Sequence, residues 1–315
     1  MSPSTKLLAG VELGGTKIVC ILGTGPEDVR AVERLPTGER EETMRQVEAV
    51  LDRWRTQHGT PRALGIASFG PVDMRSGSPT YGFITSTTKP GWRNTDIAQR
   101  LGRRFGGPVG FDTDVNGAAL AEGRWGAAKG LDDFAYVTVG TGIGVGLIVR
   151  GKSVFGMNHT ELGHIRVVRK PGDKFAGMCP FHGDCIEGLA SGPAIEARAG
   201  MPASRLSPDD PAWDFVAHGI AQLLHTMVLT TAPSRIFLGG GVLSAQTHLF
   251  ERIQQELKRS LNGYVEAPEL EQGIAQYIVP PGLGSMAGPL GALALAADAE
   301  IASSIALPRT TAASR

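Results

Sequence analysis

The chain has 315 residues, and its 31 Lys and Arg residues balance its 31 Asp and Glu residues, so the formal net charge at pH 7 is zero. This balance excludes the basic surface that non-specific nucleic-acid binding needs, and it provides no attraction to acidic membranes. Three cysteines are too few for an extracellular disulfide framework, which favours a cytoplasmic protein. Glycine is in excess, with 43 residues, which indicates tight turns and backbone that approaches another group closely.

No stretch of the sequence predicts a secretory signal or a membrane span. The first nine residues lack an apolar core followed by a cleavage site. The most apolar stretches, Phe215–Ala232 and Leu283–Ala297, are interrupted by polar residues or by Pro289. We therefore expect both to be core helices of a soluble protein.

In the first half of the chain, short apolar runs alternate with segments of helical spacing. We predict, in order, strands at Leu8–Leu13 and Lys17–Leu22, a helix over Glu41–Gln57, a strand at Ala63–Ala67, a long loop over Ser76–Arg93, a strand at Val109–Asp112 and a helix over Val115–Ala128. A loop of that length is usually functional.

The second half repeats this alternation and ends in a Thr/Ser/Ala-rich tail at 308–315, which we expect to be mobile. We predict strands at Phe134–Val139 and Gly144–Val149, helical chain from about 200 to 232, a strand at Arg235–Leu238, a helix over Glu251–Leu261, a strand at Ile274–Val279 and a helix over Gly288–Ala302. The segments that begin at Gly10 and Val137 are both a strand, a glycine turn and an apolar strand. This weak repeat predicts two related domains.

Three glycine-rich turns predict a site for phosphate groups. Consecutive backbone N–H groups bind phosphate, and side chains obstruct that approach. The turns are Gly14-Gly15-Thr16-Lys17, Gly140-Thr141-Gly142 and Gly239-Gly240-Gly241. Neither the P-loop pattern nor the dinucleotide fingerprint is present. Each turn alone is also typical of a plain hairpin, but three in one α/β chain favour a nucleotide.

Asp114 lies where a predicted strand ends and an Ala-rich helix begins. One interpretation is a helix N-cap, a role that Asp112 could also fill. The other is a general base that takes a proton from an attacking hydroxyl, because phosphoryl transfer needs positioning and charge neutralisation and little else. The sequence leaves both interpretations open.

The spacing Cys179-x2-His182-x2-Cys185 predicts a structural zinc site, since two thiolates and an imidazole suit Zn²⁺ and a fourth ligand completes a tetrahedron. His164 is the favoured fourth ligand, and His159 is a weaker rival. Cys20 lies in an apolar strand and is a poor candidate. The alternative is that the three residues share a turn by chance.

Together these pieces resemble the ROK family of sugar kinases and repressors, and within it the zinc-containing bacterial fructokinases. The resemblance runs from about Gly10 to Ala297. It is carried by Gly10-Val-Glu-Leu-Gly-Gly-Thr-Lys, Phe69-Gly-Pro-Val-Asp, Lys89-Pro-Gly-Trp, Asp112-Thr-Asp-Val-Asn, Val139-Gly-Thr-Gly-Ile-Gly, His159-Thr-Glu-Leu-Gly-His, Cys179-Pro-Phe-His-Gly-Asp-Cys and Leu238-Gly-Gly-Gly-Val.

The resemblance implies an actin-like (hexokinase/Hsp70-type) ATPase fold, with two α/β domains and an interdomain cleft. The domains would span residues 1–114, joined by the C-terminal helix at about 288–303, and residues 115–287, which include the zinc loop 164–185. It also implies a homodimer that phosphorylates fructose to fructose 6-phosphate with ATP and Mg²⁺. Alternatives are a kinase of glucose, mannose or an N-acetylhexosamine, and a sugar-responsive regulator. The regulator would carry a helix-turn-helix ahead of the first glycine turn, for which nine residues leave no room.

The resemblance also assigns roles to residues. Asp114 would be the general base, and the sugar would bind to Thr113, Asp114, Glu161, His164 and Glu187. Zinc would be held by His164, Cys179, His182 and Cys185. The nucleotide would bind to Gly14, Gly15, Thr16, Lys17, Gly140, Thr141, Gly142, Pro193, Gly239, Gly240, Gly241 and Val242. Two residues depart from the commonest family pattern and match the fructokinase branch: Thr113, where many relatives have Asn, and Glu12, where Asp is common among glucokinases.

Overall fold

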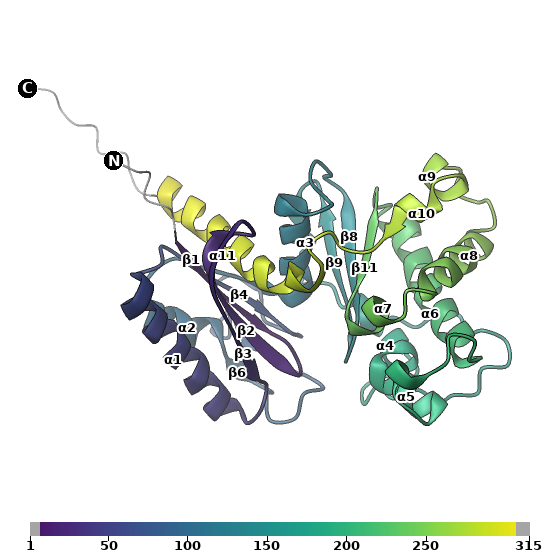
Figure 1. The fold of residues 1–315 in the computed structure, drawn as a ribbon, viewed down its shortest axis with the longest axis horizontal. Coiled ribbons are helices and arrows are strands. Elements are labelled where there is room, and N and C mark those ends of the chain that lie inside the picture. The colour runs from purple at the N-terminus through teal and green to yellow at the C-terminus, as the bar shows by residue number, and fades with distance from the viewer. Residues whose placement is uncertain (1–6, 307–315) are drawn as a thin grey trace, which may run out of the picture. The chain divides into compact units, whose positions relative to one another are not determined.

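The computed structural model describes residues 7–306, which form two compact units (Figure 1). One unit combines the chain up to Gly117 with the chain from Gly288 onward, and the other comprises Ala118–Ala287. Within the described residues, each unit is built around a five-stranded sheet. The tail at 308–315 lies outside the described residues.

The sheet of the first unit has the order β3-β2-β1-β4-β7. An antiparallel meander of three strands continues into two parallel strands, because β4 pairs parallel with β1 and β7 pairs parallel with β4. The strands are β1 (Leu8–Leu13), β2 (Lys17–Gly25), β3 (Asp28–Pro36), β4 (Leu64–Ser68) and β7 (Val109–Thr113), and β5 (Phe83–Ile84) and β6 (Thr95–Asp96) form a separate short hairpin. The helices are α1 (Arg40–His58), α2 (Ala98–Phe105), the start of α3 (Asp114–Trp125) and α11 (Ala287–Ala306).

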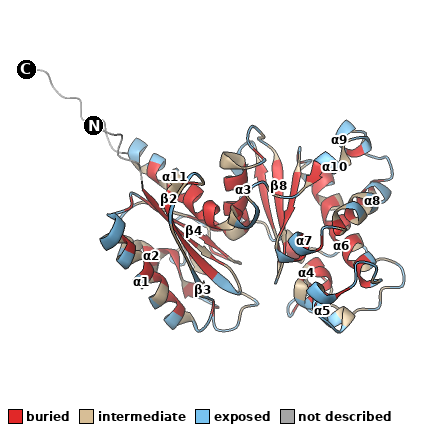
Figure 2. Ribbon diagram, viewed as in Figure 1, coloured by how far each residue is buried: buried red, intermediate tan, exposed pale blue. Residues whose placement is uncertain are grey.

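Helices α1 and α2 cover one face of this sheet. The predicted apolar stripe of α1 is buried at Met44, Val47, Val50 and Trp54, and the Glu39 carboxylate caps the helix by accepting the N–H groups of Glu41 and Glu42. Buried residues follow the strands and the inner sides of these helices (Figure 2).

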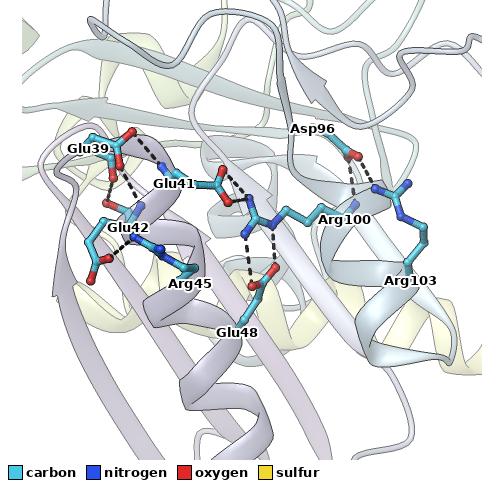
Figure 3. A network of polar contacts seen from close by, with 9 residues as sticks. Glu39, Glu41, Glu42, Arg45, Glu48, Asp96, Arg100 and Arg103 are labelled. Carbon is cyan, nitrogen blue, oxygen red and sulfur yellow. Dashed lines mark hydrogen bonds and ion pairs between the residues drawn. The ribbon is translucent and has the colours of Figure 1, made fainter.

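Arg100 joins the two helices on their outer side (Figure 3). From α2, its guanidinium donates to both carboxylate oxygens of Glu48 on α1, with the shorter bond at 2.6 Å, and it pairs with Glu41 at 2.7 Å. Asp96 accepts the Arg100 N–H and pairs with Arg103. Such a bidentate pair within a network fixes geometry better than an isolated surface ion pair.

A row of three glycines allows α11 to pack directly against the opposite face of the sheet. Gly10, Gly65 and Gly110 lie side by side on β1, β4 and β7. A Cβ on Gly65 would lie 1.8 Å from the Ala292 carbonyl oxygen, and one on Gly110 would lie 2.2 Å from the Leu295 carbonyl oxygen. The glycine excess therefore reflects, in part, a helix that packs directly on sheet backbone.

The second unit repeats the topology of the first. Its sheet has the order β10-β9-β8-β11-β12, with β8 and β9 antiparallel and β8, β11 and β12 parallel. The strands are β8 (Phe134–Val139), β9 (Ile143–Val149), β10 (Lys152–Ser153), β11 (Ile236–Gly239) and β12 (Ile278–Val279). The helices are α4 (Ile186–Ala190), α5 (Gly192–Ala199), α6 (Ala212–Thr230), α7 (Gly241–Ala245), α8 (Leu249–Leu261), α9 (Pro268–Glu271) and α10 (Ile274–Tyr277), with 3₁₀ turns η1 (Leu162–His164), η2 (Ala203–Arg205) and η3 (Gly284–Met286). The shared order is the arrangement that the internal repeat predicted.

Several predicted elements are wrong in extent or type. The segment Ile274–Val279 is mostly a turn of helix, α10, and its last two residues pair with β11. The predicted helical chain from about 200 is broken until Ala212, because Pro202, Pro208 and Pro211 interrupt it. Strand β3 was not predicted, since an edge strand with mixed charges lacks a buried alternation. Within residues 7–306, no helix has the length and apolarity needed to cross a bilayer.

Replacing Gly65 with Ala should lower the free energy of unfolding of the first unit by about 3 kcal/mol, the upper end of the usual cost of overpacking, because the new Cβ meets helix backbone. Urea unfolding followed by circular dichroism measures the effect. Gly102→Ala is the matched control, because on α2 the nearest atom to the new Cβ is a Val109 methyl at 3.3 Å. Equal stability of the two variants would contradict the close packing of α11.

Candidate functional site

The junction of β7 and α3 places three polar side chains at one end of the first sheet. Thr113 Oγ1 accepts the N–H of Asn116 at 3.2 Å, which is the helix-capping bond. Asp112 Oδ1 accepts the N–H of Thr113 at 2.7 Å and the Asn116 amide at 2.8 Å. Asp114 Oδ1 accepts the N–H of the next residue, Val115, at 2.9 Å. The hydroxyl of Thr113 therefore caps α3, and the carboxylates of Asp112 and Asp114 do not take this role.

Two carboxyl groups near this junction, those of Asp114 and Glu12, have raised pKa values. The pKa of Asp114 is raised to about 6, mainly by burial and to a smaller extent by the charge of Asp112, while backbone N–H groups act in the opposite direction. Burial also raises the pKa of Glu12, on β1, to about 7, with a contribution from the charge of Asp114. A carboxyl that titrates near neutral pH is suited to accept a proton from a substrate.

Glu12 is a candidate to which the sequence analysis gave no role. Its side chain lies on the α11 face of the sheet, in register with Ala67 and Asp112 on the neighbouring strands. A Cβ on Gly288 would lie 2.0 Å from Glu12 Oε1, so the start of α11 covers this carboxylate closely. The alternation that buries Val11 and Leu13 on the other face could have revealed its position.

The first glycine turn closes the hairpin of β1 and β2. The N–H of Gly14 donates to the Lys17 carbonyl at 2.9 Å, and Thr16 and Lys17 are exposed. A Cβ on Gly15 would meet no atom within 4 Å. The turn therefore presents open space above bare backbone and carries a cation beside it.

In the second unit, the other two glycine turns come together. A Cβ on Gly240 would lie 2.4 Å from the Val139 carbonyl oxygen, and the N–H of Gly192 donates to the Gly140 carbonyl at 2.7 Å. A Cβ on Gly140 would lie 3.8 Å from the N atom of Gly241. The residues predicted for the nucleotide in this unit thus cluster: Gly140, Thr141, Gly142, Pro193, Gly239, Gly240, Gly241 and Val242.

Four side chains form a compact potential metal site. The ligand atoms of His164, Cys179, His182 and Cys185 all lie within 4.8 Å of one another. His164 Nδ1 lies 3.7 Å from Cys179 Sγ and 3.5 Å from Cys185 Sγ, and His182 Nδ1 lies 3.6 Å from Cys179 Sγ. Ligand atoms on a zinc tetrahedron with bonds of about 2.0–2.3 Å are roughly 3.3–3.8 Å apart, so this donor set fits Zn²⁺.

The backbone around the cysteines favours the same site. Cys179 and Gly183 exchange two backbone hydrogen bonds, at 2.8 and 3.1 Å, which form a tight knuckle. Gly183 has a φ of +64°, which a glycine adopts without strain. Cys20 is fully buried in β2, where burial raises the pKa of its thiol to about 12, so it is unsuited to bind metal. His159, the weaker rival, lies outside the cluster.

The metal site lies next to the second glycine turn through Glu187. His164 Nε2 lies 3.9 Å from Glu187 Oε1, and Glu187 Oε2 accepts the N–H of Ile143 at 3.0 Å. Gly163 packs against the same residue, because its Cβ would lie 1.8 Å from the Ile143 carbonyl oxygen. The glycine in Glu161-Leu-Gly-His is therefore needed for η1 to approach β9. Glu161, at the start of η1, is exposed.

The predicted site residues are divided between the units. Gly14–Lys17, Thr113 and Asp114 belong to the first, and the remaining residues, including the metal cluster, belong to the second. In the second unit, His164 lies beside Glu187 and within the metal cluster.

The chain is similar to known proteins over most of its length. A protein of Bacillus subtilis strain 168 is 47% identical over 93% of this chain and 96% of its own length, and a fructokinase of Pediococcus pentosaceus is 42% identical over 92% and 97%. The solved structure of a ROK hexokinase from Thermus thermophilus superposes with a TM-score of 0.75 at 30% identity, covering 94% of this chain and 99% of that one. A ROK glucokinase from Streptomyces griseus, in complex with glucose and AMPPNP, gives a TM-score of 0.74 at 26% identity, covering 93% and 99%.

The predicted family and fold class are confirmed by these matches. The two units have the actin-like ATPase fold of the hexokinases that they resemble. The ROK family model matches residues 8–299, and the chain therefore belongs to the ROK family.

Proposed function

We propose that this protein is an ATP-dependent sugar kinase that phosphorylates fructose at the 6-hydroxyl. The observation that carries the proposal is the carboxyl group of Asp114, which begins α3 directly after β7 and whose pKa burial raises to about 6. Strand β7 belongs to the same sheet as the hairpin that carries the first glycine turn. The named activity of the Pediococcus pentosaceus relative supports fructose as the sugar. The presence of Thr113, rather than Asn, before the base also favours fructose over glucose.

Asp114 acts as the general base in this proposal. Its carboxylate takes the proton of the sugar 6-hydroxyl while the hydroxyl oxygen forms a bond to the γ-phosphorus of ATP. The bond from that phosphorus to the β–γ bridging oxygen breaks, and ADP leaves with the bond electrons. Mg²⁺ bound with ATP would neutralise charge on the transferring phosphoryl group.

The other predicted residues bind and orient the reactants. We assign hydrogen bonds to the sugar to Thr113, Glu161, His164 and Glu187. The first glycine turn and the cluster around Gly140–Gly142 bind the phosphates, while Pro193 and the segment 239–242 flank the adenosine. Backbone turns suit this role because they offer N–H groups without side-chain obstruction.

The four-residue cluster holds a structural Zn²⁺. The ion would hold the segment between His164 and Cys185 closed and fix the His164 ring, so that Nδ1 faces the metal and Nε2 faces Glu187. We further propose a homodimer in the cytoplasm, as the resemblance to the fructokinases implies.

Purified protein should contain about one zinc ion per chain, and its removal by a chelator should weaken sugar binding through His164. Hydrogen exchange should accelerate at the knuckle amides of Met178, Cys179 and Gly183. The amides of α1 are an internal control, since this helix belongs to the first unit and lies outside the segment between His164 and Cys185. Metal analysis that finds no zinc in freshly purified protein would rule out this assignment.

Activity should fall as the pH drops through about 6, because protonation of Asp114 removes the base. The quantity to measure is kcat/KM for the sugar between pH 5 and 8.5. Asp112→Asn keeps an acceptor oxygen but removes a charge that raises the pKa of Asp114, so its acidic limb should move to lower pH. An unchanged limb in that variant, or none in the wild type, would contradict the assignment.

An ATP-coupled assay across fructose, glucose, mannose and N-acetylglucosamine tests the function, with the highest kcat/KM expected for fructose. Asp114→Asn is the matched control, because the amide oxygen can still accept the Val115 N–H, and its kcat should fall by roughly 10²–10⁴ while sugar binding persists. Higher turnover on another hexose would change the proposed substrate from fructose to that sugar, but it would leave the proposed phosphoryl transfer unchanged. Retention of more than a few per cent of activity by the variant would exclude Asp114 as the base.

A further inference from the structure

Thr37 stands at the corner between β3 and α1 and contacts the first glycine turn twice. Its hydroxyl donates to the Gly14 carbonyl at 2.8 Å, and its N–H donates to the Thr16 carbonyl at 3.0 Å. The side chain is 6% exposed, so these bonds form largely out of contact with water. One residue therefore holds two carbonyls of the turn on the same side.

The orientation of a carbonyl determines the orientation of the next N–H. In a planar trans peptide, the C=O and N–H groups point in opposite directions. Because the Gly14 carbonyl points to Thr37, the N–H of Gly15 is directed away from Thr37. Bare backbone directed in this way is what a phosphate-binding turn requires.

A second segment is fastened to the same corner. Lys89 Nζ donates to the Thr37 carbonyl at 2.9 Å, and the indole N–H of Trp92 donates to the Gly38 carbonyl at 3.1 Å. Trp92 is fully buried, and its ring packs edge-on against Phe69, with the ring centres 5.7 Å apart. The loop between β5 and β6, which carries the Lys89-Pro-Gly-Trp motif, is thus tied to the support of the glycine turn.

We propose that Thr37 is a positioning residue for nucleotide binding, and that Lys89 reinforces it. The Thr37 hydroxyl holds the Gly14–Gly15 peptide in the orientation that receives the phosphates of a nucleoside triphosphate, and the Lys89 ammonium restrains Thr37 from its other side. This inference rests on the proposed kinase function, in which the first glycine turn binds phosphate. Neither residue needs to touch the nucleotide.

The test compares Thr37→Val, which keeps the side-chain shape without the hydroxyl, with Thr37→Ser, which keeps the hydroxyl. Affinity for Mg·AMP-PNP, measured by calorimetry without sugar, should fall about fivefold in the Val variant, the effect of one hydrogen bond of average strength. The Ser variant should stay within about twofold of the wild type, since it retains the donor. Adenosine affinity should be equal in all three proteins, because adenosine carries no phosphate.

Lys89→Met provides a second variant, which removes the ammonium group of a half-buried side chain and leaves the turn sequence intact. Its Mg·AMP-PNP affinity should fall about threefold, less than for Thr37→Val, because the bond acts on the turn through Thr37. Lys89→Arg, which can still donate to the Thr37 carbonyl, should restore it. This pair decides the matter if Thr37→Val fails to fold.

The outcomes separate this inference from the function on which it rests. A wild-type protein that binds no Mg·AMP-PNP and phosphorylates no hexose would refute the proposed function. A wild type that does both, beside a Thr37→Val variant with a lower melting temperature and unchanged Mg·AMP-PNP affinity, would show that Thr37 is merely structural and overturn the inference. An equal loss of adenosine affinity would also overturn it, since the effect would not depend on phosphate.

Discussion

The direct contact of α11 with the sheet of the first unit determines the environment of the carboxyl groups at the end of that sheet. Gly10, Gly65 and Gly110 allow the helix to lie on bare strand backbone. Two residues farther along the same strands, the same face carries Glu12, Ala67 and Asp112, because strand side chains alternate. The start of α11 then covers Glu12 at Gly288. Packing that excludes water from this face therefore also raises the pKa of Glu12, to about 7.

In the second unit, one backbone residue connects the metal cluster with the glycine turn. The N–H of Ile143 donates to Glu187, and the Ile143 carbonyl is approached by Gly163, the neighbour of His164. A metal ion that orders His164 would therefore restrain both the carboxylate and the 3₁₀ turn that flank this residue. Through Glu187, the cluster is linked to the backbone that the nucleotide is proposed to meet.

The sequence predicted those features that follow from local spacing. The apolar stripe of α1, the two hairpins and the Cys179/His182/Cys185 spacing depend on residues near one another in the chain, and all are present in the structure. Which residue caps α3 could not be predicted, because it depends on side-chain orientation. In the structure, the Thr113 hydroxyl caps the helix. Whether residues 274–279 form a strand or a helix depended on where α10 ends. Only the last two residues of this segment remain to pair with β11. The sequence did not predict the burial of Glu12 under α11 or the bonds of Thr37 to the first glycine turn, because their partners come from distant segments.

The two units share a topology but hold their glycine turns in different ways. In the first unit, a hydroxyl from the β3–α1 corner donates to a turn carbonyl; in the second, a carboxylate from α4 accepts an N–H where the turn enters β9. A three-residue turn with two glycines has little of its own to fix its peptide planes, since glycine loses more conformational freedom on folding than any other residue. Each unit therefore supplies one buried or half-buried polar side chain from outside its hairpin. Both units therefore support their glycine turn from outside the hairpin, but they use different residues to do so.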